Sequence, residues 1–189
     1  MYKAVAFDFF GVIQNDQYTV WLSNHGFKKQ GEFSDLSIAA DKDFIEMKDF
    51  YEGLSKLSRI PAIEIKAEFD KPQHLDEAVI KIIKKIREKY KTALASNSNS
   101  DYLIEMLQRN KLDDLFDEVI ISGEVGYSKP SAEFFEYLLK KLDLLPSQVV
   151  FIDDTPQNVV SAEALGIKSI GFTDALALKD DLIGLGLKF

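Results

Sequence analysis

Val5-Ala6-Phe7-Asp8-Phe9-Phe10-Gly11-Val12-Ile13 is the stretch that decides the fold, because one carboxylate interrupts an apolar run suited to a buried strand. A buried charge without a partner is unfavourable, so the Asp8 side chain must reach water, a metal ion or a substrate. We therefore predict a strand that ends at Asp8, with this carboxylate at the start of an active site.

Further apolar runs follow, separated by segments with helical spacing. The spacing of apolar residues predicts an amphipathic helix with a stripe formed by Ala78, Val79, Ile82, Ile83 and Ile86, and the lysines between them are expected to form its solvated face. Strands that alternate with helices form parallel sheets with right-handed crossovers. The sequence thus predicts an α/β protein with a Rossmann-like, doubly wound parallel sheet. Its later strands are expected at 92–96, 119–123, 149–152 and 168–172.

The segment that follows the first strand lacks strand alternation and contains helix-like pieces separated by glycine and proline. It predicts a small α-helical insertion. We expect a core formed by residues 1–14 and 77–189, and a helical cap formed by residues 15–76. Trp21, Asn24 and Tyr51 could face a substrate from this cap, although aromatic residues in a helical insert belong more often to its core.

Polar residues fall at the predicted carboxyl ends of several strands, where ligands of doubly wound sheets bind. Asp8 ends the first strand, Ser96 ends the second, and Asp153-Asp154 follows Val149–Ile152. Thr155 is a credible helix N-cap with Pro156 at the next position. The three carboxylates predict an oxygen-rich pocket for Mg²⁺, and hence phosphoryl chemistry.

The same residues support a two-step reaction. Asp8 could attack phosphorus to form an aspartyl-phosphate, and Lys129 would supply fixed positive charge for the phosphate oxygens. Ser96 and Asn97 could donate hydrogen bonds to the transferring group. Each residue alone also has an ordinary role: Asp8 in a turn, Ser96 as a cap, Lys129 on the surface, and Asp153-Asp154 at a helix dipole.

Taken in order, these segments resemble the four motifs of the haloacid dehalogenase-like (HAD) hydrolases. The likeness spans nearly the whole chain, and its most specific part is Phe151 to Gly166. The matching residues are Asp8-Phe9-Phe10-Gly11-Val12, Leu94-Ala95-Ser96-Asn97, Lys129-Pro130, and Phe151-Ile152-Asp153-Asp154 followed by Asn158.

The resemblance implies roles for individual residues. Asp8 would be the nucleophile and a metal ligand, and Ser96 with Lys129 would hold the phosphoryl group. Asp154 would be an acidic metal ligand with Asp153 beside it. The residue two places after the nucleophile gives its backbone carbonyl to the metal in this family, which assigns Phe10 to the metal site through its main chain. Asn158 stands where many relatives carry a second acidic residue.

Phe10 departs from the family pattern, because phosphatases of the family usually have an aspartate there as general acid and base. The leading interpretation is a Mg²⁺-dependent phosphatase of small phosphorylated metabolites. One alternative is a 2-haloacid dehalogenase, which resembles this chain at Phe10 and needs no proton donor for a halide. Another is a binding or regulatory protein that retains a metal or phosphate site without turnover.

The amino-acid composition narrows the kinds of site and partner that the protein can have. The 189 residues include no cysteine, which excludes disulfides and thiolate sites, and only two histidines, so a metal would have oxygen ligands. The net charge of −8 argues against nucleic acid and anionic membranes as partners. No apolar run is long enough to span a bilayer and no export signal is evident, so a cytoplasmic location is expected. The oligomeric state is not indicated.

Overall fold

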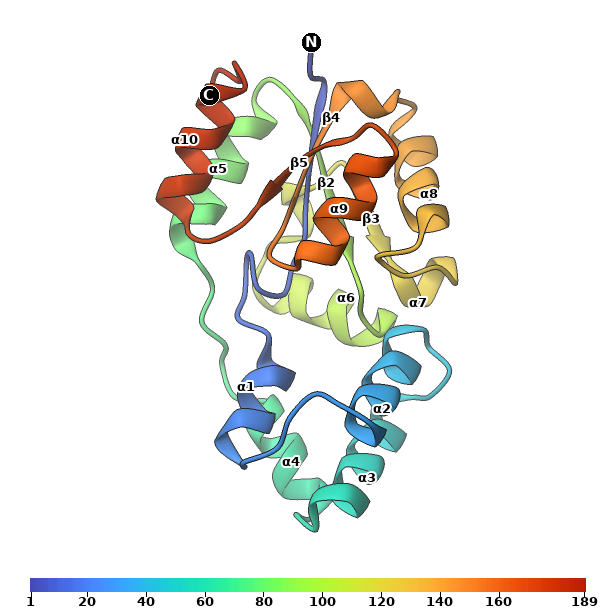
Figure 1. The fold of residues 1–189 in the computed structure, drawn as a ribbon. Coiled ribbons are helices and arrows are strands. Elements are labelled where there is room, and N and C mark those ends of the chain that lie inside the picture. Colours follow the sequence, from blue (N-terminus) through green and yellow to red (C-terminus); the bar gives the residue numbers. More distant parts are fainter.

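The computed structural model describes residues 1–189 and contains one five-stranded parallel sheet with strand order β3-β2-β1-β4-β5 (Figure 1). This confirms the predicted doubly wound α/β class. The last strand ends at Gly171, one residue earlier than expected. The strands are β1 Ala4–Phe7, β2 Lys91–Ser96, β3 Glu118–Ile121, β4 Val149–Asp153 and β5 Lys168–Gly171.

Side chains of the central strand alternate between two apolar layers. Val5 and Phe7 face a layer that includes the isoleucines of α5 (Glu77–Arg87). Ala4 and Ala6 face the opposite layer, where the phenylalanines of α8 (Ala132–Leu142) pack. Small residues on the strands therefore leave room for large residues on α8. Both faces of the sheet are buried, as expected for a parallel sheet.

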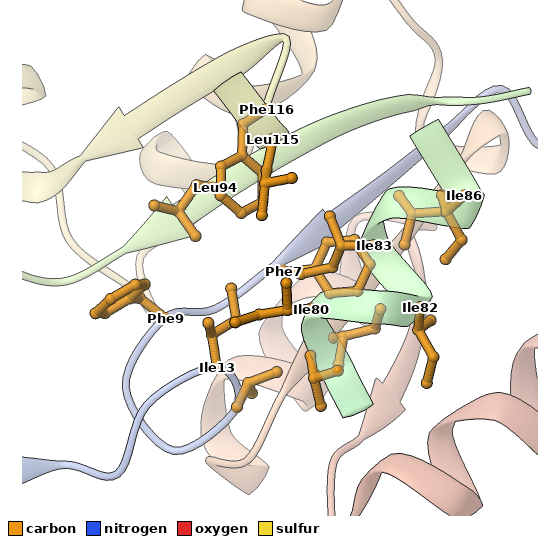
Figure 2. Packing of buried hydrophobic residues seen from close by; sticks show 14 of the residues in the cluster. Phe7, Phe9, Ile13, Ile80, Ile82, Ile83, Ile86, Leu94, Leu115 and Phe116 are labelled. Atoms are coloured by element: carbon orange, nitrogen blue, oxygen red, sulfur yellow. The ribbon is translucent and has the colours of Figure 1, made fainter. Parts of the chain in front are cut away.

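Helices cover both faces of the sheet. α5 lies beside α10 (Ala175–Gly184), and α8 lies beside α9 (Pro156–Ala164) on the other face (Figure 1). Figure 2 shows the isoleucines of α5 packed around Phe7. Ala78, which the periodicity assigned to the apolar stripe of this helix, is exposed, and Ile80 is buried instead. The remaining core helices are α6 Ser100–Arg109 and α7 Ser122–Val125, with short 3₁₀ turns at Asp113–Leu115 and Pro146–Gln148.

The sheet places its topological switch point between β1 and β4. After β1 the chain builds β2 and β3 on one side, and then crosses to add β4 and β5 on the other side. In such sheets the crevice at the carboxyl ends of the two strands at the switch point is the usual ligand site. Asp8 follows β1 and Asp153 is the last residue of β4, so both lie at this position.

Four insert helices lie between β1 and α5 in the sequence and sit at the carboxyl ends of the strands, away from both chain termini (Figure 1). They have their own apolar cluster, which includes Trp21, Tyr51 and Leu54. Trp21 and Tyr51 are thus core residues of the insert. The insert helices are α1 Gln17–Asn24, α2 Glu32–Asp41, α3 Met47–Ser58 and α4 Ala62–Phe69.

Candidate active site

The fold brings three carboxylates together at the switch point. Asp8, Asp153 and Asp154 each offer an oxygen atom, and these atoms all lie within 4.8 Å of one another. Asp8, Phe10 and Asp154 line a cavity of about 400 Å³, to which both core and insert residues contribute. The predicted acidic pocket is therefore a real cluster that opens into a space suited to a small molecule.

Lys129 is the cation of this cluster, and its side chain is only 1% exposed. Its Nζ lies 2.8 Å from Asp8 Oδ1 and 2.7 Å from Asp153 Oδ2. Lys129 is thus not a surface lysine. It ties the end of β1 to the end of β4 and places a fixed positive charge between them.

Asn97 positions Lys129 through the backbone. The Asn97 amide donates to the Lys129 carbonyl oxygen at 2.8 Å, and its Oδ1 accepts from the Lys129 N–H at 2.8 Å. This two-point contact joins the end of β2 to the loop before α8. Asn97 also lines the cavity, so its amide is both a positioning group and part of the wall.

Asp153 and Asp154 are adjacent in sequence but differ in surroundings. Asp153 is fully buried, and its oxygens accept from Lys129, from the Asn158 amide at 3.0 Å and from the Thr155 N–H at 2.8 Å. These contacts occupy the acceptor positions of a carboxylate. Asp154 accepts only from the Thr155 hydroxyl, at 3.3 Å, and lines the cavity. Asp154 therefore has free oxygen atoms for a ligand, whereas Asp153 holds the lysine.

Thr155 occupies the predicted N-cap position of α9, with Pro156 at the first helical position. Its side chain does not cap the helix, which differs from the expected role. The hydroxyl donates to Asp154 instead, and the Thr155 N–H donates to Asp153. The start of this helix is thus arranged around the acidic pair.

The buried charges of the cluster are not balanced by the protein alone. Burial raises the pKa of Asp8 to about 8, with Asp153 acting in the same direction and Lys129 opposing both. Burial and the adjacent Asp153 carboxylate also raise the pKa of Asp154. Burial by itself would lower the pKa of Lys129, but Asp8 and Asp153 outweigh it and raise that pKa. An added cation would stabilise the ionised carboxylates.

The available donor atoms fit Mg²⁺, which prefers oxygen ligands and keeps some positions for water and substrate. Asp8 Oδ1 accepts from Lys129 and from the Phe9 N–H, at 2.8 and 2.7 Å, which leaves Oδ2 without a protein partner. The Phe10 carbonyl oxygen accepts no backbone hydrogen bond. Together with an oxygen of Asp154, these atoms are oxygen donors that no protein group occupies, and all three residues line the cavity.

Gly11 makes room for this arrangement. It has a φ of +87°, and a Cβ at this position would overlap the Asp154 carboxylate. We expect Gly11→Ala to displace Asp154 and to weaken Mg²⁺ binding by about 10-fold or more, as disruption of ligand support does in other metal sites. Titration calorimetry with Mg²⁺ measures this effect.

The matched control is Gly186→Ala, because Gly186 has a φ of +84° and open space where its Cβ would lie. Both variants carry similar backbone strain. Equal Mg²⁺ affinities in the two variants would show that Asp154 is not a ligand.

Ser96 is fully buried at the end of β2, and its Oγ has no hydrogen-bond partner. A buried hydroxyl of this kind is unfavourable unless a ligand or water satisfies it. Ser96 is not among the residues that line the cavity, whereas the next two residues, Asn97 and Ser98, are. Its predicted contact with a phosphoryl group therefore requires a ligand that reaches beyond the residues lining the cavity.

Several cavity residues come from the insert and were not identified from the sequence. Asp16, Lys29 and Asp41 supply charges, and Tyr102 of α6 reaches the cavity beside Phe10 with its hydroxyl donating to Gln17 Oε1 at 2.8 Å. Asn24, which was considered as a substrate contact, is exposed and does not line the cavity. No motif or spacing in the sequence marks Asp16, Lys29 or Asp41 as cavity residues.

Comparison with known proteins agrees with this geometry. The model of the haloacid dehalogenase-like hydrolase family matches residues 5–172. Sesquiterpene phosphatase astK of Aspergillus oryzae is 41% identical over 64 residues, which cover 34% of this chain and 33% of that protein. The phosphorylated carbohydrates phosphatase of Thermotoga maritima is 27% identical over 126 residues, which cover 67% of this chain and 57% of that protein. The chain thus spans between a third and somewhat over half of these relatives.

Among solved structures, a variant of a HAD family enzyme from Bacteroides thetaiotaomicron, in complex with magnesium and inorganic phosphate, superposes with a TM-score of 0.76. The two chains are 23% identical, and the match covers 94% of this chain and 99% of the other. At this identity the likeness concerns the fold. None of the helices in the structure is long and apolar enough to cross a bilayer.

Proposed function

Because the chain belongs to the haloacid dehalogenase-like hydrolases, we propose that it is a Mg²⁺-dependent phosphatase of small phosphorylated metabolites. The observation that carries the proposal is the cluster of Asp8, Asp153 and Asp154, which borders the cavity and in which Lys129 contacts Asp8 and Asp153. The phosphatases among its relatives support the same class of substrate.

Asp8 acts as the nucleophile in this proposal. Lys129 and the Phe9 N–H both contact Oδ1, so the carboxylate is held in one orientation and the unshared Oδ2 is free to attack phosphorus. The buried ammonium of Lys129 also stabilises negative charge that develops on the phosphoryl oxygens. The unpaired Ser96 hydroxyl and the amide of Asn97 are the further donors available to that group.

The proposed metal ligands are Asp8, the Phe10 carbonyl and Asp154, with Asp153 contributing negative charge to the same cluster. Bound Mg²⁺ would draw electron density from the phosphoryl group and neutralise its charge. Asp153 is placed to keep Lys129 oriented, because both groups are buried and 2.7 Å apart.

The insert helices bound the cavity opposite this cluster, and we propose that residues 15–76 act as a cap over a core of residues 1–14 and 77–189. A cavity of about 400 Å³ lies within the range of small-molecule sites. Its mixed polar and aromatic lining, which includes Gln17, Tyr18 and Tyr102, suits a small organic phosphate. We propose a cytoplasmic location for this activity, where such metabolites occur.

Phe10 favours a second candidate, a 2-haloacid dehalogenase. Its half-buried ring stacks on Tyr102 with a centroid separation of 6.4 Å and cannot donate a proton to a leaving group. A halide needs no such proton. The unshared oxygens of Asp154 have no role in that reaction, which is why the phosphatase is the preferred function.

Phosphate release from p-nitrophenyl phosphate and from a panel of sugar phosphates, with Mg²⁺ and with EDTA, tests the proposal. We expect release that requires Mg²⁺ and stops with EDTA. Metal-independent chloride release from 2-chloropropionate would instead establish the dehalogenase. Inertness in both assays, with Mg²⁺ or phosphate still raising the melting temperature, would identify a binding protein.

A further inference from the structure

Two carboxylates that line the cavity have no part in the proposed phosphatase site. The acidic residues that line the cavity are Asp8, Asp16, Asp41 and Asp154. Asp8 and Asp154 belong to the nucleophile and the metal site. The two others come from the insert, and the reaction still lacks a group that handles protons, because Phe10 stands at the place that the family usually gives to one.

Asp16 is already engaged. Its carboxylate caps α1 by accepting from the N–H groups of Tyr18 and Thr19, it accepts from the Thr19 hydroxyl at 2.5 Å, and it lies 3.7 Å from Lys29 Nζ. The Asp41 carboxylate, in contrast, accepts no hydrogen bond from any protein group, although the residue is half-buried and lines the cavity. It is therefore the carboxylate of the insert that remains free to exchange a proton with a ligand.

Two contacts hold Asp41 against the core. Its carbonyl oxygen accepts from the Ser122 hydroxyl, and Ser122 Oγ in turn accepts from the Ser98 N–H at 2.9 Å. Ser98 itself lines the cavity and directly follows Asn97, which positions Lys129. The backbone of Asp41 is thus connected through Ser122, Ser98 and Asn97 to Lys129, which contacts the nucleophile.

Asp43 secures the same segment two residues later. Its carboxylate accepts from the Asn99 amide at 2.6 Å, from the Ser100 N–H at 3.0 Å and from the Ser100 hydroxyl. Gly123 permits this approach, since a Cβ there would overlap the Asp43 carboxylate. The end of α2 is consequently docked on the core with the Asp41 side chain beside the cavity.

We infer that Asp41 is the general acid and base of the reaction, supplied by the insert in place of the residue that Phe10 replaces. The inference rests on the proposed phosphatase function. It assigns proton transfer to a group of the insert that lines the same cavity as the nucleophile.

The reaction has two steps, and Asp41 transfers a proton in each of them. Asp8 Oδ2 forms a bond to phosphorus while the bond from phosphorus to the leaving oxygen breaks, and that oxygen takes a proton from Asp41 to leave as an alcohol. In the second step, ionised Asp41 takes a proton from water as the water oxygen bonds to phosphorus. The bond from Asp8 to phosphorus breaks, its electron pair returns to the carboxylate, and phosphate leaves with Asp41 protonated again.

The charges around Asp41 suit this role. Burial raises its pKa to about 6, Asp16 and Asp43 act in the same direction, and Lys29 and Lys129 oppose them. Tyr18 is the other titratable group that faces it, and Asp41 contributes to raising the pKa of that phenol. A carboxyl group with a pKa near the working pH can both give and accept a proton. A bound phosphate adds negative charge and favours the protonated form further.

The test compares Asp41→Asn with Asp35→Asn, the same change at an exposed position of the same helix. An alkyl phosphate has a poor leaving group that needs a proton, whereas p-nitrophenolate leaves without one. We expect Asp41→Asn to lower kcat/KM by about 10²-fold for glucose 6-phosphate but less than about 10-fold for p-nitrophenyl phosphate. With the latter substrate, kcat should fall and acid-quenched phosphoenzyme should accumulate, because the second step has lost its base.

The acid role of Asp41 predicts how kcat/KM depends on pH. In the wild type, kcat/KM for the alkyl phosphate should decline as the pH rises through the pKa of Asp41, because the acid form disappears. This decline should be absent from Asp41→Asn and present in Asp35→Asn. Adding Phe10→Asp to Asp41→Asn should restore at least about 10-fold of the lost kcat/KM, since the new carboxyl group stands near the nucleophile.

The possible results of these experiments distinguish a failure of this inference from a failure of the proposed function. A wild type without Asp8-dependent phosphate release would overturn the phosphatase and the role of Asp41 together. An active wild type with equal losses for both substrates in Asp41→Asn would overturn the role of Asp41 alone. So would an increase in KM at unchanged kcat, which would make Asp41 a substrate-binding group. Melting curves of the variants show whether any loss comes from misfolding.

Discussion

Asp8→Asn is expected to lower kcat/KM for phosphate release by about 10³-fold or more, because an amide cannot replace the carboxylate as a nucleophile. Asparagine has nearly the shape of aspartate and can still accept the Phe9 N–H that Asp8 Oδ1 accepts at 2.7 Å. The change therefore removes the reacting group and leaves the local backbone in place. Initial rates with p-nitrophenyl phosphate and Mg²⁺ measure the loss.

Trapping of the phosphoenzyme distinguishes a lost nucleophile from a disturbed site. Wild-type protein quenched in acid during turnover should carry covalent phosphate, and Asp8→Asn should carry none. Asp101→Asn, an equivalent change at an exposed position of α6, should behave as the wild type. Covalent phosphate on Asp8→Asn in wild-type amounts would assign the nucleophile to another residue.

The fold was predictable because local pattern and topology agree. The apolar run before Asp8 reads as a strand buried on both faces, and the structure shows why: Ala4 and Ala6 face one layer while Val5 and Phe7 face the other. The isoleucines of α5 have helical spacing for the same reason, since one side of that helix must cover the sheet (Figure 2). Ala78 was misplaced because it lies at the edge of the stripe, where the helix rotation decides exposure.

The sequence was also sufficient to predict that the main polar residues meet at one edge of the sheet. Asp8, Asp153 and Lys129 come from separate segments, and parallel topology places the ends of those segments together. It could not distinguish the surroundings of Asp153 and Asp154. That difference depends on which carboxylate meets the Thr155 N–H and the Asn158 amide, and these contacts exist only in the folded turn.

The cavity residues that come from the insert could not be predicted from the sequence, for a different reason. Asp41 is one of many acidic residues on polar helix surfaces, and no periodic pattern sets it apart. Its place beside the site depends on tertiary docking, through Ser122 at its carbonyl and through Asp43 two residues on. For Trp21 and Tyr51, which could have faced a substrate or belonged to the core of the insert, the structure shows the core role that is commoner for aromatic residues.

Lys129→Met should be the most destabilising single change in the site. Methionine fills a similar volume but leaves Asp8 and Asp153, which Lys129 contacts at 2.8 and 2.7 Å, without their buried counter-charge. Breaking a buried pair by removing one partner costs about 3–5 kcal/mol. We expect a loss of this size in urea unfolding with EDTA present. Lys84→Met, at an exposed position of α5, should change stability by less than about 0.5 kcal/mol.

The electrostatic origin of the loss can be isolated by a double-mutant cycle. If unbalanced carboxylates cause it, Lys129→Met should be less destabilising in an Asp8→Asn background, because one of the two buried charges is then gone. Mg²⁺ should likewise recover part of the lost stability, since it places positive charge on the same carboxylates, but it should not restore phosphate release. A cost that is unchanged by both Asp8→Asn and Mg²⁺ would mean that Lys129 stabilises the fold through packing of its aliphatic chain, and that its contacts to Asp8 and Asp153 contribute little.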